Sequence, residues 1–203
     1  EKEETGREYS DFAVLYRTNA QSRLLEEKCI LYSIPYRLVG GVNFYQRKEI
    51  KDILCYLKTI ANGQDDLAVQ RIINVPKRGI GATSVGKVTI FASANGMSFY
   101  DALLRVRGIT TLGKAADKIG VFTEQIEDFK ARLPKMSIKE LIEEVLENTG
   151  YKKEIEAEGE IESETRLQNI EELINKAVSY SENEENPTLD GFLEEVALVA
   201  DFP

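Results

Sequence analysis

The chain has 203 residues, of which 42% are hydrophobic and 30% charged, so it is long and apolar enough to fold around a buried core. It contains no histidine and only two cysteines, which excludes Ser-His-Asp and Cys-His catalysis and any histidine-ligated or four-thiolate metal site within it. The net charge is −9, but residues 1–90 carry 14 Lys/Arg and 11 Asp/Glu (net +3) and residues 91–203 carry 12 and 24 (net −12), so a polyanion site is expected in the first ninety residues.

The first forty residues alternate between strand and helix patterns. Phe12–Tyr16 is a short, β-prone apolar run that predicts a buried strand, a helix follows over about 24–32, and Ile34–Val39 predicts a second strand. This βαβ order is typical of a parallel sheet. Because two strands cannot form a stable sheet alone, either the other strands lie outside this chain or the segment docks on the helices that follow.

From residue 46 onward the periodicity is helical, so the predicted fold class is mainly α, with a small α/β segment at the N-terminus. Pro76, Asn95-Gly96 and Pro134 mark predicted helix ends, and Ser137-x-x-Glu140 is a capping box at a predicted helix start. The predicted apolar faces cover residues 50–57, 67–75, 84–94, a segment starting at 98, 115–133, 138–146, 167–178 and 192–199.

A glycine-flanked turn between two of these helices is the strongest candidate site. Its residues are Lys77, Arg78, Gly79, Ile80 and Gly81, followed by Thr83. Glycines permit a tight turn, Ile80 can fill the space between the helices, and the free N–H groups with two adjacent cations suit a phosphate of a DNA backbone. An ordinary helix corner with Ser/Thr capping fits the same spacing.

The segment Gly81–Lys87 also fits G-x-x-x-x-G-K, the start of a nucleotide-binding P-loop. Val88 stands where that loop needs a hydroxyl for magnesium, and Pro76 interrupts the strand that should precede the first glycine. We therefore do not expect a nucleotide site here, and a free-standing nucleotide hydrolase is the least favoured of the functions considered.

Two further segments are candidate sites in the first fifty residues. The loop after the first predicted strand offers Arg17, Asn19, Gln21 and Arg23, which suit phosphates and base edges, although a polar loop that caps the next helix has the same composition. Gly40-Gly41 lies where the fold type changes, so it is a candidate hinge or a plain flexible linker.

The sequence gives weaker indications of the cellular compartment and of the role of the acidic second half of the chain. Cys29 and Cys55 lie among apolar residues, which favours two reduced thiols and a cytoplasmic location. No apolar run approaches the ~18 residues of a membrane span, and no secretory leader is recognisable, so no membrane partner is expected. The chain begins at Glu1, which suggests a processed product or a piece of a longer protein. The Glu-rich stretch 154–164 is typical of a solvated helix face.

Three segments together resemble the UvrD/PcrA group of superfamily 1 DNA helicases. They are Phe12–Arg23 (FAVLYRTNAQSR), Phe44–Asp52 (FYQRKEIKD) and Pro76–Gly81 (PKRGIG), and their order and spacing match as well. Thr165–Leu173 is similar to a more variable helical region of the same family. The resemblance runs through nearly the whole chain and is strongest over residues 12–87.

This resemblance implies a domain plan and a site assignment. Residues 1–45 would be part of the second RecA-like motor domain, and residues 46–203 its helical accessory insertion. The turn from Lys77 to Gly81 would contact the duplex ahead of the fork. The loop with Arg17, Asn19, Gln21 and Arg23 would lie near the single-strand track. Arg47 would belong, with Gly40 and Gly41, to the hinge between motor and insertion.

The resemblance also implies an activity for the parent protein. The parent would be an ATP-dependent 3′ to 5′ DNA helicase that uses ATP and Mg²⁺, with duplex and single-stranded DNA as partners. The family's Walker A lysine, magnesium carboxylates and γ-phosphate arginines match nothing here, so this piece alone is expected to bind no ATP and to be inactive. The alternative is an acidic helical module that docks repair or transcription proteins, and both functions can coexist.

Overall fold

The computed structural model describes residues 6–200, which are mainly helical. The outermost residues of both predicted domains, 1–5 and 201–203, lie outside the described residues. The N-terminal part contains the 3-10 helices η1 (Tyr9–Asp11), η2 (Asn19–Gln21) and η3 (Phe44–Gln46) and the helix α2 (Ser22–Leu31). The helical part then runs through α3 (Lys48–Ala61), α4 (Asp66–Ile72), α5 (Ala82–Asn95), α6 (Phe99–Leu104), η4 (Val106–Gly108), η5 (Thr110–Leu112), α7 (Ala115–Arg132), η6 (Leu133–Lys135), α8 (Ile138–Asn148), α9 (Tyr151–Glu156), α10 (Glu160–Asn183) and α11 (Leu189–Ala200).

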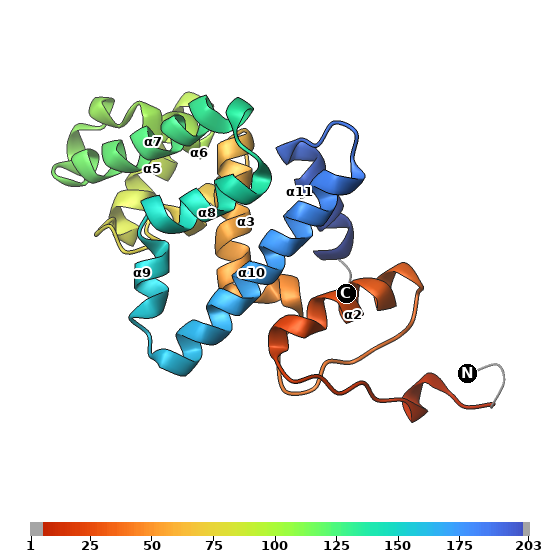
Figure 1. Cartoon of the computed structure of the whole chain (residues 1–203). Helices are drawn as coiled ribbons and strands as arrows, with labels where there is room; N and C mark the ends of the chain where they lie inside the picture. The colour runs from red at the N-terminus through yellow and green to blue at the C-terminus, as the bar shows by residue number, and fades with distance from the viewer. Residues whose placement is uncertain (1–5, 201–203) are drawn as a thin grey trace.

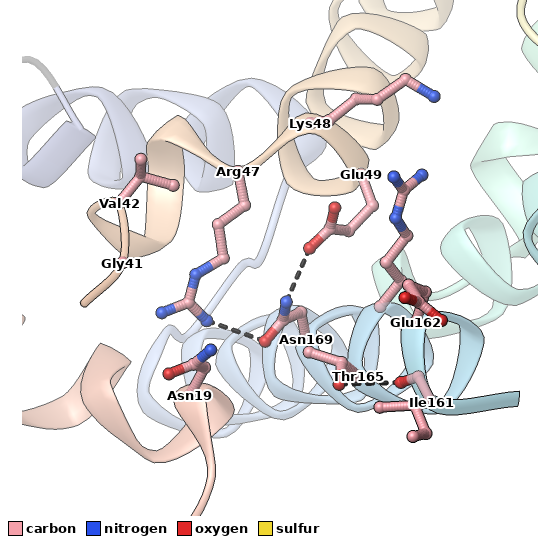
Figure 2. Close-up of a pocket in the computed structure, with 11 residues that line it drawn as sticks. Asn19, Gly41, Val42, Arg47, Lys48, Glu49, Ile161, Glu162, Thr165 and Asn169 are labelled. Atoms are coloured by element: carbon pink, nitrogen blue, oxygen red, sulfur yellow. Dashed lines mark hydrogen bonds between the residues drawn. The ribbon is translucent and has the colours of Figure 1, made fainter. Parts of the chain in front are cut away.

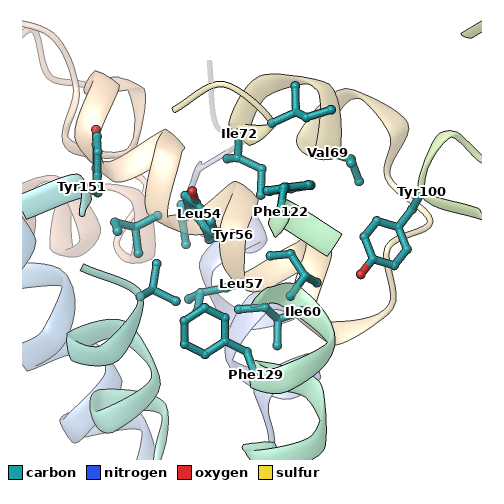
Figure 3. Packing of buried hydrophobic residues seen from close by; sticks show 14 of the residues in the cluster. Leu54, Tyr56, Leu57, Ile60, Val69, Ile72, Tyr100, Phe122, Phe129 and Tyr151 are labelled. Carbon is teal, nitrogen blue, oxygen red and sulfur yellow. The ribbon is translucent and has the colours of Figure 1, made fainter. Parts of the chain in front are cut away.

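Helix α3 forms the centre of the molecule (Figure 1). Its apolar positions follow the predicted 3-4 spacing, and Ile50, Ile53 and Leu57 are fully buried. Helices α4, α7, α8, α10 and α11 all contact α3, and Phe122 and Phe129 of α7 pack beside it in the core (Figure 3). The core therefore belongs to the helical part, with α5, α6 and α7 at one end and residues 6–43 at the other (Figure 1).

The predicted helix boundaries are largely confirmed by the capping contacts. The Ser98 side chain accepts a hydrogen bond from the Asp101 amide, and Ser137 with Glu140 forms the predicted capping box. Gly96 ends α5 in the left-handed conformation. A further break was not predicted: Gly159, at φ +118°, separates the short helix α9 from α10, so the acidic stretch 154–164 spans two helices.

The predicted βαβ segment is wrong for the described residues, which contain no strand. Phe12–Tyr16 and residues 34–38 have no regular secondary structure and no strand partner, and only the helix between them is present. Leu15 is 93% exposed and Val39 79% exposed, so the predicted burial is wrong as well. A strand forms through hydrogen bonds to a neighbouring strand, and these two segments do not pair with each other.

Candidate nucleic-acid interface

The turn between α4 and α5 presents a cluster of unused backbone N–H groups. Gly79 has φ +71°, a conformation that favours glycine, whereas Gly81 is the N-cap of α5 with φ −84°, which any residue adopts. Ile80 is 2% exposed and fills the space between the helices as predicted. Four exposed residues donate no backbone hydrogen bond within the described chain: Gly79, Gly81, Ala82 and Thr83.

These four N–H groups gather at the N-terminus of a 14-residue helix. The first amides of a helix lack intrahelical acceptors, and the aligned peptide dipoles place positive potential at that end. Lys77 is exposed beside them, and its ammonium makes no ion pair within residues 6–200. These N–H groups and the Lys77 ammonium can therefore bind an anionic oxygen that approaches from solvent.

Arg78 does not face solvent in this turn. Its Nη2 donates to the Tyr56 hydroxyl at 2.6 Å, and its guanidinium carbon lies 5.1 Å from the centre of the Phe122 ring. Its Nη1 lies 3.0–3.3 Å from four carbonyl oxygens, those of Ile72, Ile73, Val75 and Pro76. The Arg78 guanidinium thus donates hydrogen bonds to carbonyl oxygens at and beyond the C-terminal end of α4. Burial raises the pKa of the Tyr56 hydroxyl, which keeps it neutral.

Three residues that shape the turn were not singled out from the sequence. Asn74 Oδ1 accepts hydrogen bonds from the amides of Arg78 and Ile80, at 2.8 and 3.1 Å. Glu154 Oε2 accepts from the Lys77 amide at 2.7 Å, and Lys118 Nζ donates to the Gly79 carbonyl at 3.2 Å. An asparagine just before a Pro/Gly turn is a local signal that could have been read, but Glu154 and Lys118 reach the turn only through the tertiary fold.

The segment Gly81–Lys87 begins a helix and follows the turn after α4, so it lacks the strand–loop–helix form of a P-loop. Lys87 Nζ donates to the Thr111 carbonyl at 2.6 Å, and Val88 is fully buried. No group of three or more Cys, Asp or Glu residues in the described chain could hold a metal ion. The Gly81–Lys87 segment therefore does not have the structure of a P-loop.

The four candidates of the N-terminal loop divide into two pairs. Arg17 and Asn19 are exposed, and their side chains make no hydrogen bond within residues 6–200. Gln21 Oε1 accepts from the amides of Arg17 and Thr18, so it caps η2. Arg23 is 4% exposed and its guanidinium pairs with Glu27 and Glu172, so it is not presented to a ligand.

The predicted hinge contains a buried polar network. Gly40 and Gly41 are exposed, and Gly40 has φ +82°. Arg47, by contrast, is 7% exposed, and it donates to Ser22 Oγ of α2 and to Asn169 Oδ1 of α10, both at 2.7 Å. The hydrogen-bond network extends from Asn169 to Glu49, because Asn169 Nδ2 donates to Glu49 Oε1 at 2.6 Å (Figure 2). Burial lowers the pKa of Arg47, and nearby Glu26 and Glu49 favour its charged form.

The same network borders a pocket of about 440 Å³ between the N-terminal segment, the start of α3 and α10. Glu26 also accepts from the Phe44 amide at 3.0 Å, which ties α2 to η3. Every buried side-chain polar atom in the described chain has a partner. The junction is thus held by satisfied hydrogen bonds, and Arg47 is one of its fixed points.

Among residues 6–200, no helix is both long and apolar enough to span a membrane.

The comparisons with known proteins agree with one another. The family model described as "UvrD-like helicase C-terminal domain" matches residues 1–202. The chain is 45% identical to the ATP-dependent DNA helicase PcrA of Bacillus subtilis (strain 168) over 196 residues, which cover 97% of this chain and 26% of that protein. It is 46% identical to PcrA of Staphylococcus epidermidis (strain ATCC 12228 / FDA PCI 1200) over 200 residues, 98% of this chain and 27% of that protein. The chain therefore spans about a quarter of the length of these relatives.

Proposed function

Because the chain belongs to the UvrD-like helicase C-terminal domain family, we propose that it is part of an ATP-dependent 3′ to 5′ DNA helicase and contacts the duplex through the turn at Gly79–Thr83. The observation that carries the contact is the cluster of four N–H groups at the start of α5 that find no acceptor in the described chain, beside Lys77, which forms no ion pair there. Such donors bind phosphate oxygens and read no bases, so the contact is independent of sequence.

We assign residues 1–45 to an incomplete motor domain and 46–203 to its accessory insertion. The support is the apolar surface of the first segment: Val14, Leu15 and Val39 are each more than 60% exposed on backbone without strand partners. Strands of the same sheet, supplied by the rest of the parent protein, would cover these side chains. Arg17 and Asn19, whose side chains make no hydrogen bond within residues 6–200, are then the candidates for contact with single-stranded DNA, and Gly40-Gly41 for movement between the two parts.

The ATP and Mg²⁺ of the parent would be bound by residues outside this chain. The P-loop-like segment here is the start of a helix whose lysine is bonded to a carbonyl. The isolated chain is accordingly proposed to bind DNA without hydrolysing ATP.

The duplex contact is tested by substituting Gly81, where a Cβ would meet no atom within 4 Å and the backbone is not strained. Gly81→Thr adds bulk to the exposed edge of the turn, and its hydroxyl can cap the next amides, while Thr and Gly are about equally good N-caps. We expect an unchanged melting temperature, with weaker binding of this chain to a short duplex and slower unwinding by the parent helicase. Unchanged binding and unwinding would contradict the proposed contact.

A second candidate function, docking of a basic partner protein, is favoured by one surface. Ile161 at the start of α10 is 77% exposed and is flanked by Glu160 and Glu162, neither of which forms an ion pair within the described residues. Replacing both glutamates by glutamine should abolish capture of a repair or transcription partner while leaving duplex binding intact. Loss of duplex binding instead, with capture unaffected, would argue against this second function.

A further inference from the structure

From residue 77 onward, the cations that form ion pairs and those that do not lie in different parts of the described chain. Residues 77–118 hold seven Lys/Arg and two Asp/Glu, a net of +5 in a chain of net −9. Within the described residues, none of those seven cations forms an ion pair. Of the eight Lys/Arg in residues 119–200, six do: Lys130, Arg132, Lys139, Lys152, Arg166 and Lys176. Among residues 77–200 the cations without an ion pair are thus concentrated between residues 77 and 118, whereas six of the ten Lys/Arg in the described residues 6–76 also form no ion pair.

The fold brings Lys118 to the turn and connects α5, the helix after the turn, to the segment before α7. Lys118 donates to the Gly79 carbonyl at 3.2 Å, which places the first turn of α7 against the turn. Lys87 of α5 donates to the Thr111 carbonyl at 2.6 Å, which places it against the segment leading to Lys114. Lys114 and Lys118 are four residues apart at the start of α7 and so share one face.

We propose that Lys77, Lys87, Lys114 and Lys118 form one cationic surface that binds the phosphate backbone of duplex DNA beyond the contact made by the turn. The inference rests on the proposed function and adds α7 and the segment before it to the duplex site. Two acidic residues lie beside these lysines: Asp117, which precedes Lys118 in the first turn of α7, and Glu154, which accepts a hydrogen bond from the Lys77 amide. The four ammonium groups outnumber these two carboxylates, so the surface remains cationic.

The absence of exposed aromatic rings favours duplex over single-stranded DNA as the occupant. Proteins that hold single strands stack bases on aromatic side chains. Between residues 77 and 118 of the described chain, no aromatic residue is exposed: Phe99 and Tyr100 are buried and Phe91 is partly buried. The exposed aromatic residues of the described chain all precede residue 40: Tyr9, Phe12, Tyr32 and Tyr36.

The test is the salt dependence of duplex binding by the 203-residue chain, measured by fluorescence anisotropy with a labelled blunt duplex. For the Lys87→Gln/Lys114→Gln variant, we expect the slope of log K against log salt concentration to fall in magnitude by about 1.8, at about 0.9 for each phosphate that the variant no longer neutralises. The matched control is Lys135→Gln/Lys139→Gln, which removes the same charge from the acidic part of the chain. The control slope is expected to stay unchanged. The single variant Lys114→Gln keeps the test valid if the double variant is unstable, because the Lys114 ammonium has no partner in the described chain.

The outcomes separate this inference from the function on which it rests. An unchanged slope in the Lys114 and double variants, with salt-dependent binding by the unaltered chain, would overturn the cationic surface and leave the turn contact standing. An equal fall in the control would also overturn it, because the effect would then be one of net charge. No duplex binding by the unaltered chain at 50 mM salt would overturn both proposals.

Discussion

At the turn between α4 and α5, two adjacent cations have different surroundings. The Lys77 side chain is exposed and unpaired, whereas the Arg78 guanidinium lies among carbonyl oxygens, the Tyr56 hydroxyl and the Phe122 ring. The sequence predicted the turn, the role of Ile80 and the cationic character, because glycine spacing and charge are local properties. It could not predict the direction of Arg78, since that depends on carbonyls and an aromatic ring that only the packing of α3, α4 and α7 brings together.

The first prediction separates these two cations. Arg78→Lys should lower the free energy of unfolding by about 2–3 kcal/mol, because an ammonium cannot replace the forked donors that reach both the carbonyls and Tyr56. Lys77→Gln should leave stability unchanged and weaken duplex binding several-fold. Urea denaturation and duplex titration measure the two effects. A stable Arg78→Lys variant would mean that the partly buried guanidinium does not organise the turn.

The second prediction concerns Glu154, whose carboxylate accepts a hydrogen bond from the Lys77 amide in the position that a phosphate oxygen could occupy. Glu154→Gln keeps a hydrogen-bond acceptor there and removes the negative charge, so the affinity for duplex DNA should rise several-fold. Glu156→Gln is the matched control, since it removes the same charge from an exposed position on the same helix. Weaker binding by Glu154→Gln would instead mean that the carboxylate is needed to shape the turn.

At the scale of helices and strands, the sequence predicted what depends on one segment alone. Helix periodicity and caps are properties of consecutive residues, so α3, α7 and α8 are found where they were expected. A strand depends on its neighbours, so Phe12–Tyr16 has the composition of a strand but not the hydrogen bonds of one. The junction at Arg47 likewise depends on distant residues, because the hydrogen-bond partners of Arg47 are 25 and 122 residues away in the sequence.

The third prediction is made for this junction. Arg47→Ala should lower the free energy of unfolding by about 3–5 kcal/mol, because it leaves Asn169, Ser22 and the nearby carboxylates buried without their partner. The substitution Gly41→Ala is the control, since its Cβ would make only an ordinary 3.7 Å contact. Urea denaturation measures both, and equal stability of the two variants would show that the network does not hold the junction.

Across the whole molecule, most exposed apolar side chains and the stretch of strongest net positive charge lie in different regions. Exposed apolar side chains concentrate in residues 12–42, whereas residues 77–118, with a net charge of +5, lie at the other end of the fold (Figure 1). The first region is consistent with a surface completed by the rest of a longer protein, and the second with a surface for a polyanion. The division of charge at residue 90 made from the sequence falls inside the second region, because its cations begin at Lys77 and continue to Lys118.

The fourth prediction follows from the apolar region. Leu15→Gln with Val39→Thr should leave the stability of this chain within about 0.5 kcal/mol, because both side chains are already in water. The same pair in the parent helicase should destabilise it, because the residues would there be buried against further strands. Thermal unfolding of both proteins measures the difference. Equal tolerance in the parent would contradict the assignment of residues 1–45 to an incomplete motor domain.

The proposed contact at the turn is tested most directly by amide NMR of this chain titrated with a short duplex. We expect the largest shifts on binding at the N–H groups of Gly79, Gly81, Ala82 and Thr83, and we expect added salt to reverse them. Shifts confined to other residues, with these four amides unmoved at saturating duplex, would contradict the proposed contact.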